Sequence, residues 1–239
     1  MPLRTQQLEV RHVEILEAFK AFKSVINGSN TVISNHDDYS FWDSWKNQVD
    51  VESIVFTGHS FGGCTILHIL SHSTPDEPDS LPISKVIIHD PWLEPLSPDF
   101  EDSAIQSGKF FSIPVLVINS TQFTLWRDHF ARAEKLFTAW VQQAANGSTF
   151  ITFVGSKHMA FSDFPVLVSM SKQAISFHHD MHDLSNAFID DKVRQFFLSK
   201  ADRITKEFIV DNPEDRNRKR IRANNGSFVV HCSSTDPLN

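Results

Sequence analysis

A serine close to two glycines is the residue whose surroundings most clearly indicate chemistry. The segment Gly58-His59-Ser60-Phe61-Gly62 follows an apolar, β-branched run and precedes a helix-like stretch over residues 65–70. Between a strand and a helix, G-x-S-x-G is typical of a nucleophile elbow, a sharp turn that exposes the serine hydroxyl. We expect glycine at 58 and 62 because side chains there would clash with the adjoining strand and helix. The alternative is a glycine-rich turn with an incidental serine.

The elbow interpretation also assigns a role to the residue after the serine. Ser60 Oγ would lie at the carboxyl end of the strand, and the Phe61 N–H, at the start of the helix, would point to where an oxyanion forms. A serine hydroxyl becomes a competent nucleophile only beside a base, and the base needs an acid that orients it. The remaining chain must therefore supply a histidine and a carboxylate near Ser60.

Apolar runs alternate with amphipathic segments along the chain. This alternation predicts an α/β protein with a mostly parallel sheet and right-handed crossovers. In such sheets the ligand crevice lies beyond the carboxyl ends of the strands. We predict strands over residues 53–57, 85–89, 113–119 and 149–154, and helices over 6–25, 127–145, 166–178 and 190–198.

The predicted base is His158, which lies in a loop directly after the strand at 149–154. A histidine with only a structural role in that loop is the alternative. The elbow should turn His59 away from Ser60 Oγ. The remaining rivals lie on or just past the helix after the elbow, or on a later helical stretch: His68, His72, His178, His179 and His182.

The predicted acid is Asp90, which ends the strand at 85–89. Pro91 forces the chain out of regular structure there, and the order serine, aspartate, histidine is that of α/β-hydrolases. The strand at 113–119 ends without a carboxylate. Asp128 and Asp163 are competitors, but neither directly follows a strand, and we expect Asp163 to cap the next helix.

No metal site or cofactor is predicted. His178 and His182 have the four-residue spacing of metal ligands, yet they lack the carboxylate arrangement typical of zinc hydrolases. The two cysteines, Cys64 and Cys232, do not form a disulfide framework.

Composition limits the class of protein. With 239 residues and a net charge of −7, the chain fits one α/β domain and does not bind nucleic acid through its overall charge. No apolar run approaches the length of a membrane span, and the first ten residues are too polar for a secretory signal peptide. A cytoplasmic protein is therefore expected.

The last thirty residues differ in composition from the rest. A basic run is followed by Asn, Gly and Ser with little periodicity. We expect an α/β-hydrolase domain over residues 1–210 and a basic, disordered tail over 211–239, and we favour a solvated tail over a nuclear-localisation or anionic-lipid role. The run comprises Arg216, Arg218, Lys219, Arg220 and Arg222.

Three segments resemble the platelet-activating factor acetylhydrolases of the plasma and intracellular type II group. They are Gly-His-Ser-Phe-Gly-Gly at 58–63, Asp-Pro-Trp-Leu-Glu-Pro-Leu at 90–96, and Gly-Ser-Lys-His at 155–158 with Phe-Ser-Asp-Phe at 161–164. The similarity extends from the first helix to about residue 198. It implies Ser60 as nucleophile, Asp90 as acid, His158 as base and the Phe61 amide as an oxyanion donor.

The resemblance also implies an activity. The group hydrolyses short or oxidised sn-2 acyl chains of phospholipids, is calcium-independent and needs no cofactor. We therefore expect a serine esterase acting on platelet-activating factor-like glycerophospholipids. Its substrate would be met at a membrane or lipoprotein-like surface.

One departure from the family leaves other hypotheses open. Members carry several strands ahead of the elbow, and a loop there gives a second oxyanion donor, whereas the roughly 50 residues before the elbow strand here are predicted to be helix and loop. We expect an α/β-hydrolase-like fold truncated before the nucleophile strand. The alternatives are a catalytically impaired member that acts as a binding protein, and a general carboxylesterase or lipase.

Overall fold

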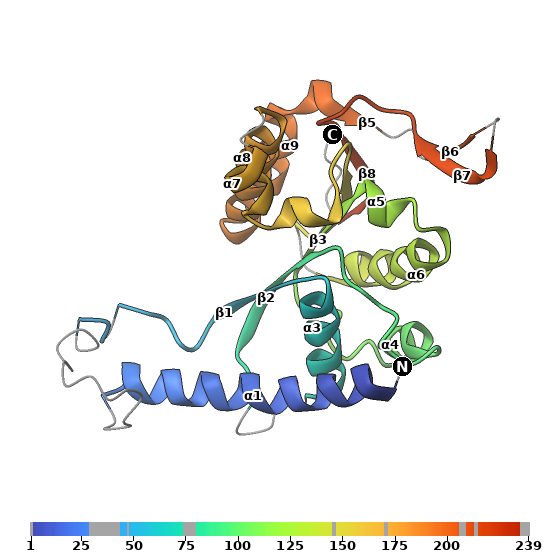
Figure 1. Ribbon diagram of the computed structural model, residues 1–239. Coiled ribbons are helices and arrows are strands. Elements are labelled where there is room, and N and C mark those ends of the chain that lie inside the picture. Colours follow the sequence, from blue (N-terminus) through green and yellow to red (C-terminus); the bar gives the residue numbers. More distant parts are fainter. Residues whose placement is uncertain are drawn as a thin grey trace.

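A mostly parallel sheet forms the centre of the computed structural model, which describes residues 2–28, 44–46, 48–73, 80–144, 147–169, 172–205, 209–212 and 215–234. Within these residues, six strands join in one sheet (Figure 1). The first four in sheet order are parallel; the fifth runs antiparallel to the fourth, and the sixth is parallel to the fifth. In sheet order the strands are β1 (Ile54–His59), β2 (Ile83–His89), β3 (Val115–Ser120), β4 (Thr149–Phe153), β8 (Phe228–Ser233) and β5 (Ile204–Thr205).

Two further strands lie outside this sheet. They are β6 (Ile209–Asn212) and β7 (Asp215–Ile221), which pair with each other in antiparallel fashion.

Helices cover both faces of the sheet, because successive side chains of each strand point to opposite faces. Val86 and Ile88 of β2 belong to one hydrophobic cluster, whereas Ile87 between them belongs to the other. The first cluster is completed by α1 (Pro2–Ile26), α3 (Phe61–His72), α4 (Phe100–Ser107) and α6 (Arg127–Gln143). The second is completed by α8 (Lys172–Ile189) and α9 (Val193–Ser199).

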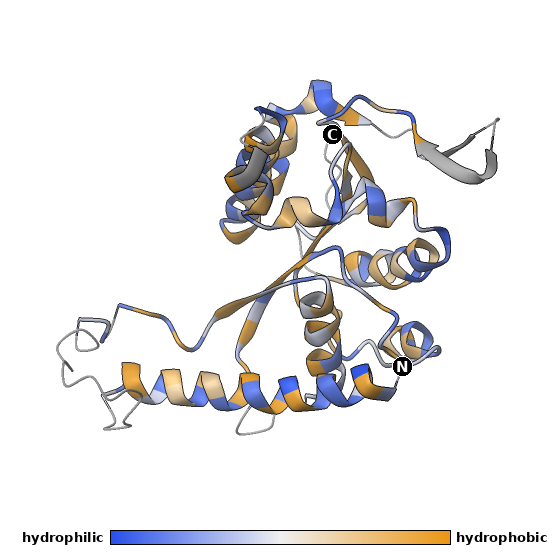
Figure 2. Ribbon diagram, viewed as in Figure 1, coloured by the Kyte–Doolittle hydropathy of each residue, from blue (hydrophilic) through white to orange (hydrophobic). Residues whose placement is uncertain are grey.

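The strands with the most hydrophobic sequences are the most deeply buried. Every residue of β3 and β4 is buried, as expected for parallel strands covered on both faces. The strands of the central sheet are largely coloured as hydrophobic, whereas the helices alternate between hydrophobic and hydrophilic residues (Figure 2). Short helical segments connect the larger elements: α5 (Thr121–Thr124), η1 (His158–Phe161), α7 (Phe164–Ser169) and η2 (Ala201–Arg203).

The helix α6 shows how sequence periodicity produces the packing. Phe130, Ala133, Phe137 and Trp140 recur every three or four residues and are all buried against the sheet. The indole N–H of Trp140 donates a hydrogen bond of 2.9 Å to the carbonyl of Ile113, so its polar edge is satisfied inside the core.

The predicted α/β fold class and its four parallel strands are confirmed, with differences at element ends. The single helix predicted over 166–178 is wrong: α7 and α8 occupy this part of the chain. The helix predicted over 190–198 begins only at Val193, and α4 was not predicted. Most of the predicted loop between α1 and β1 lies outside the described residues, and residues 44–46 form a turn.

The prediction of a disordered tail is wrong for β8. Phe228 and Val229 are buried, and β8 lies in the sheet between β4 and β5. The run Phe228-Val229-Val230 has the aromatic and β-branched residues that favour strands. Arg203 fixes the preceding turn, since its guanidinium donates hydrogen bonds to both oxygens of Asp180 and to the carbonyl of Gly226. Cys232 lies in β8, and both it and Cys64 are free thiols.

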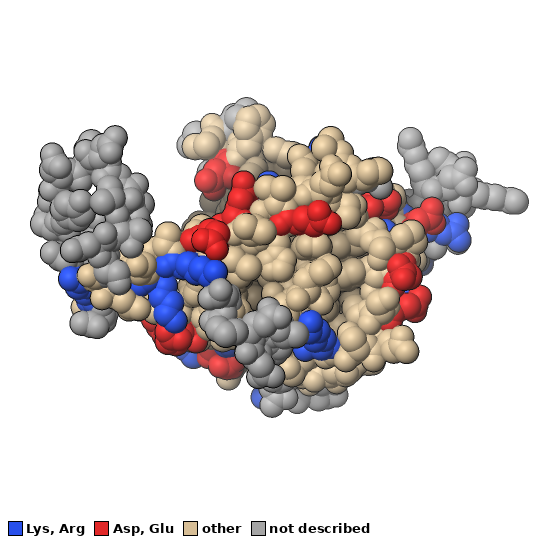
Figure 3. All heavy atoms as spheres, turned by 90° about the horizontal axis from the view of Figure 1, so that it is seen from below, with Lys and Arg blue, Asp and Glu red and all other residues tan. Residues whose placement is uncertain are grey.

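Charged side chains do not gather into one field on the face seen in Figure 3. Acidic and basic residues are interspersed there around a broad uncharged area. Among the described helices, none combines the length and apolar character that crossing a membrane requires.

β1 lies at one edge of the sheet, as the sequence predicts. Within the described residues, no strand pairs with its outer side. The consequence is visible in burial, since the side chains of Ile54, Val55 and Phe56 are only half-buried while those of β3 are fully buried. An apolar edge strand leaves backbone groups and hydrophobic area open to pairing with other chains.

We therefore predict that the isolated 239-residue chain is marginally stable and self-associates. Fusing a segment that supplies a strand beside β1, taken from a longer protein of the family that the sequence resembles, should raise the melting temperature. In a domain of this size, each 1 kcal/mol of added stability shifts the midpoint by about 2–4 °C. Thermal melting and light scattering of both proteins check this. An isolated chain that is monomeric and melts at the same temperature as the fusion would contradict it.

Candidate active site

The turn between β1 and α3 is a strained elbow with Ser60 at its tip. Ser60 has φ 58° and ψ −118°, a region that non-glycine residues rarely occupy. Its backbone is held from both directions. The Ser60 N–H donates to the carbonyl of His89 at 2.9 Å, and its carbonyl accepts from the Trp92 N–H at 3.0 Å.

Two glycines make this turn sterically feasible. The sequence predicts a requirement for glycine at only one of these two positions, Gly58. A Cβ at Gly58 would lie 2.6 Å from the carbonyl carbon of Gly62, so position 58 needs glycine. The prediction for Gly62 is wrong, because a Cβ there meets no described atom within 4 Å. The second position that requires glycine is Gly63. A Cβ there would lie 2.9 Å from Cγ2 of Ile88, because α3 crosses the sheet closely at this point.

The structure brings Ser60, Asp90 and His158 into one hydrogen-bonded chain. Nε2 of His158 lies 3.0 Å from Ser60 Oγ, and its Nδ1 lies 3.0 Å from Oδ2 of Asp90. Because a carboxylate only accepts, the Nδ1 of His158 carries the proton and Nε2 presents its lone pair to the serine. This arrangement can move the serine proton onto an oriented imidazole.

Asp90 is held rigidly at the end of β2. Its side chain has no solvent exposure, and its backbone takes a positive φ of 42°. The Ser120 N–H donates to Asp90 Oδ1 at 2.6 Å, which leaves Oδ2 for His158. Just after it, the Leu93 N–H donates to Nε2 of His129 at 3.1 Å and so anchors the segment that follows the acid.

The rival acids lie elsewhere. Asp163 is exposed and directly precedes α7, where its carbonyl accepts from the Leu167 N–H at 2.9 Å. Asp128 is exposed in the first turn of α6. Both are at helix N-termini, where a negative charge is favourable.

The other candidate histidines lie on two helices. His68 and His72 lie on α3, and His178, His179 and His182 lie on α8. Within the described residues, the group of three potential metal ligands that lie close together is His59, Asp90 and His158. His178 and His182 are not part of it.

His59 contacts His158 rather than Ser60, a contact that the sequence did not reveal. Nε2 of His59 lies 3.3 Å from Nδ1 of His158, and the ring centroids are 4.4 Å apart. Burial, followed by the nearby His158 ring, lowers the pKa of His59, while Asp90 and the His158 backbone oppose the shift. A neutral His59 can therefore accept a hydrogen bond from the Nδ1–H of His158, the same group that donates to Asp90.

Residues of α5 complete the surroundings of the base. The ring of Phe123 stacks on His158 with centroids 4.4 Å apart and an interplanar angle of 15°. The side-chain oxygen of Gln122 accepts from the His158 N–H at 3.2 Å. The only sequence signal for these residues is that they follow the carboxyl end of a predicted strand.

Burial removes the neighbouring titratable groups from chemistry near neutral pH. It raises the pKa of the Cys64 thiol to about 12 and lowers the pKa of His89 to about 4. Cys64, one turn beyond Ser60, is therefore a packed residue whose thiol stays protonated near neutral pH.

Phe61 is the first residue of α3. The helix ladder starts with the Cys64 N–H donating to the Ser60 carbonyl at 3.2 Å, so the Phe61 amide precedes it and needs no acceptor within the helix. The Phe61 ring packs against Trp92, and the guanidinium of Arg11 lies over it at 4.8 Å. Through this contact α1 reaches the side of the elbow.

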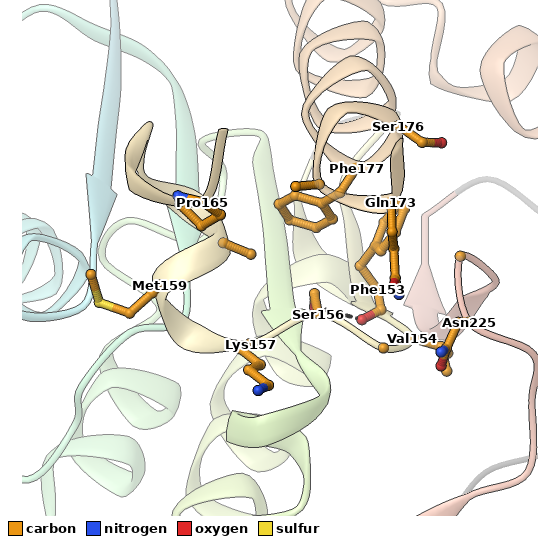
Figure 4. A pocket seen from close by; sticks show the side chains of 14 residues that line it. Phe153, Val154, Ser156, Lys157, Met159, Pro165, Gln173, Ser176, Phe177 and Asn225 are labelled. Atoms are coloured by element: carbon orange, nitrogen blue, oxygen red, sulfur yellow. Dashed lines mark hydrogen bonds between the residues drawn. The ribbon is translucent and has the colours of Figure 1, made fainter. Parts of the chain in front are cut away.

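A cavity of about 400 Å³ lies beside the loop that carries His158, next to α8 (Figure 4). None of the three residues of the hydrogen-bonded chain lines it. Its labelled lining residues are Phe153, Val154, Ser156, Lys157, Met159, Pro165, Gln173, Ser176, Phe177 and Asn225.

Comparison with known proteins identifies the family of the chain. The curated relatives include platelet-activating factor acetylhydrolases of Gallus gallus (28% identity over 162 residues, 68% of this chain and 34% of the relative), Bos taurus (27%, 70% and 33%) and Canis lupus familiaris (29%, 68% and 32%). The chain thus spans about a third of the length of these relatives. The family model described as platelet-activating factor acetylhydrolase, isoform II, matches residues 1–220, so the chain belongs to this family.

Proposed function

We propose that this chain is a serine esterase that hydrolyses the sn-2 acetyl or short acyl ester of platelet-activating factor-like glycerophospholipids through an acyl-enzyme. The observation that carries the proposal is the chain of hydrogen bonds from Asp90 through His158 to Ser60, with both contacts of His158 at 3.0 Å. Membership of the acetylhydrolase family supports the substrate class.

In the first half-reaction, Ser60 Oγ attacks the ester carbonyl while Nε2 of His158 takes its proton. Asp90 stabilises the resulting imidazolium, and the Phe61 N–H donates to the oxyanion. The tetrahedral intermediate then collapses. The bond to the glycerol oxygen breaks, and His158 returns the proton to that oxygen, which releases the lyso-phospholipid.

In the second half-reaction, water takes the place of the serine. His158 accepts a proton from the water as it attacks the acyl carbonyl, and the tetrahedral intermediate expels Ser60 Oγ, which regains a proton from His158. The acetate or short fatty acid leaves, and the enzyme is restored.

Exposed apolar side chains beside His158 support a substrate met at a membrane or lipoprotein-like surface. Met159 in η1 and Phe164 and Leu167 in α7 are 53%, 59% and 77% exposed. Three large exposed hydrophobic side chains so close in sequence are unusual on a protein that meets only water, and they lie within ten residues of the proposed base.

A second candidate is a general carboxylesterase or lipase, which the same three residues could serve. A third is a binding protein with impaired catalysis, favoured by the unpaired outer edge of β1 within the described residues. Comparing hydrolysis of 2-acetyl and long-chain 2-acyl phosphatidylcholine distinguishes the first two, and covalent labelling of Ser60 distinguishes both from the third.

Ser60→Ala should abolish ester hydrolysis and labelling by a fluorophosphonate, because only the nucleophilic hydroxyl is removed. The expected loss in turnover is on the order of 10⁶-fold, as for nucleophile removal in a serine protease. Labelled peptides identified by mass spectrometry and a short-chain ester assay provide the measurement. A variant as active as the parent would show that Ser60 is not the nucleophile.

Asp90→Asn should keep the hydrogen-bonding shape and lose about 10⁴-fold in turnover, because an amide holds the imidazole in the wrong tautomer. Asp163→Asn is the matched control, since that carboxylate is exposed and at a helix start. Turnover of both variants on the same ester gives the answer. Greater damage from the Asp163 change would reverse the assignment of the acid.

Treatment with EDTA should not lower the hydrolysis rate, because acyl transfer through a serine needs no metal ion. The rate before and after dialysis against the chelator is the measurement. A complete loss that added zinc restores would point instead to metal-dependent hydrolysis.

A further inference from the structure

Three side chains that can bind a metal ion lie close together: the proposed base and two neighbours of its Nδ1 atom. One ligand atom each of His59, Asp90 and His158 lies within 4.8 Å of the other two. Two of these separations are direct contacts: Nδ1 of His158 is 3.3 Å from Nε2 of His59 and 3.0 Å from Oδ2 of Asp90. The esterase mechanism uses Asp90 and His158 but leaves His59 without a role.

The two direct contacts have the spacing of neighbouring ligands in a tetrahedral zinc site. With zinc–nitrogen and zinc–oxygen distances of about 2.0–2.1 Å, two ligands of one tetrahedron lie about 3.3 Å apart. Two imidazole nitrogens and one carboxylate oxygen form a ligand set that suits Zn²⁺ and not Mg²⁺. Three protein ligands and one open position is a common zinc arrangement.

The ligands are also oriented and reachable. Asp90 Oδ1 is occupied by the Ser120 N–H, which directs Oδ2 toward the cluster, as partners of metal ligands commonly do. The side chain of His158 is 24% exposed and that of Asp90 is fully buried, so an ion would reach Asp90 by passing the His158 ring.

We propose that His59, Asp90 and His158 form a Zn²⁺ site whose occupation switches off the esterase. The inhibitory effect rests on the proposed function, whereas the metal site rests on the geometry alone.

The chemical reason for inhibition is the tautomer of His158. When Nδ1 binds the metal, its proton leaves to solvent, and a neutral imidazole then carries its one proton on Nε2, taken from solvent. That Nε2–H faces Ser60 Oγ at 3.0 Å and can no longer take the serine proton. No electron transfer is involved, and removal of zinc restores the proton to Nδ1.

Other histidines offer zinc an alternative and must be controlled. The rings of His12, His68 and His72 lie within 6.5 Å of one another between α1 and α3, and His178 and His182 are four residues apart on α8. The variant His72→Gln/His182→Gln weakens both alternatives without touching the cluster behind Ser60.

The first test is calorimetric titration of ZnCl₂ into full-length Ser60→Ala protein, which keeps all three ligands but cannot catalyse. Adding His59→Gln or Asp90→Asn should weaken binding at one site at least tenfold, whereas adding His72→Gln/His182→Gln should leave that site unchanged. Thermal melting without metal shows that each variant is folded. Equal zinc affinity in folded His59→Gln and Asp90→Asn variants would overturn the proposal.

The second test is the rate of fluorophosphonate labelling of the parent chain with increasing zinc. The rate should fall in proportion to occupancy and return with EDTA, Mg²⁺ should have no effect, and His59→Gln should need at least tenfold more zinc. Unchanged labelling at saturating zinc would overturn the inhibitory role. If the parent is not labelled even without zinc, the proposed function fails, and the calorimetry on Ser60→Ala still decides whether the metal site exists.

Discussion

The site depends on the parallel hydrogen-bond register of β1, β2 and β3. His59 pairs with His89, and His89 pairs with Ile118, so β1 and β2 end at the same level, and β3 continues two residues further to Ser120. The ladder continues one step further, because the Ser60 N–H donates to His89 and the Asp90 N–H donates to Ile118. A shift of one residue in either pairing would turn Ser60 or Asp90 away from the common edge.

This register explains why so much of the site was predictable from the sequence. A serine, an aspartate and a loop histidine that follow three different parallel strands must lie near one edge, and the structure places Ser60, Asp90 and His158 together there. Their catalytic roles remain predictions. Periodicity also identified α6, because its buried residues recur at helical spacing over many turns.

What was missed depends on packing between distant segments. The contact of His59 with His158 joins residues 99 positions apart, and no local pattern distinguishes His59 from an ordinary elbow residue. The glycine requirement at 63 arises from the close crossing of α3 over Ile88. β8 was taken for tail because the basic run before it outweighed three apolar residues.

The position of β8 has a consequence for synthesis of the chain. Thr149 of β4 and Ser233 of β8 are hydrogen-bonded partners 84 residues apart, so the ribosome must make the whole intervening segment before β4 gains its second neighbour. Until then β4 is an unprotected edge whose Phe150 and Phe153 lack part of their cover. Contacts of such separation form slowly and expose nascent chains to aggregation. The central sheet is therefore completed only after β8 has been made, and a premature stop even a few codons before residue 228 would leave every residue of the proposed site encoded but its supporting sheet open.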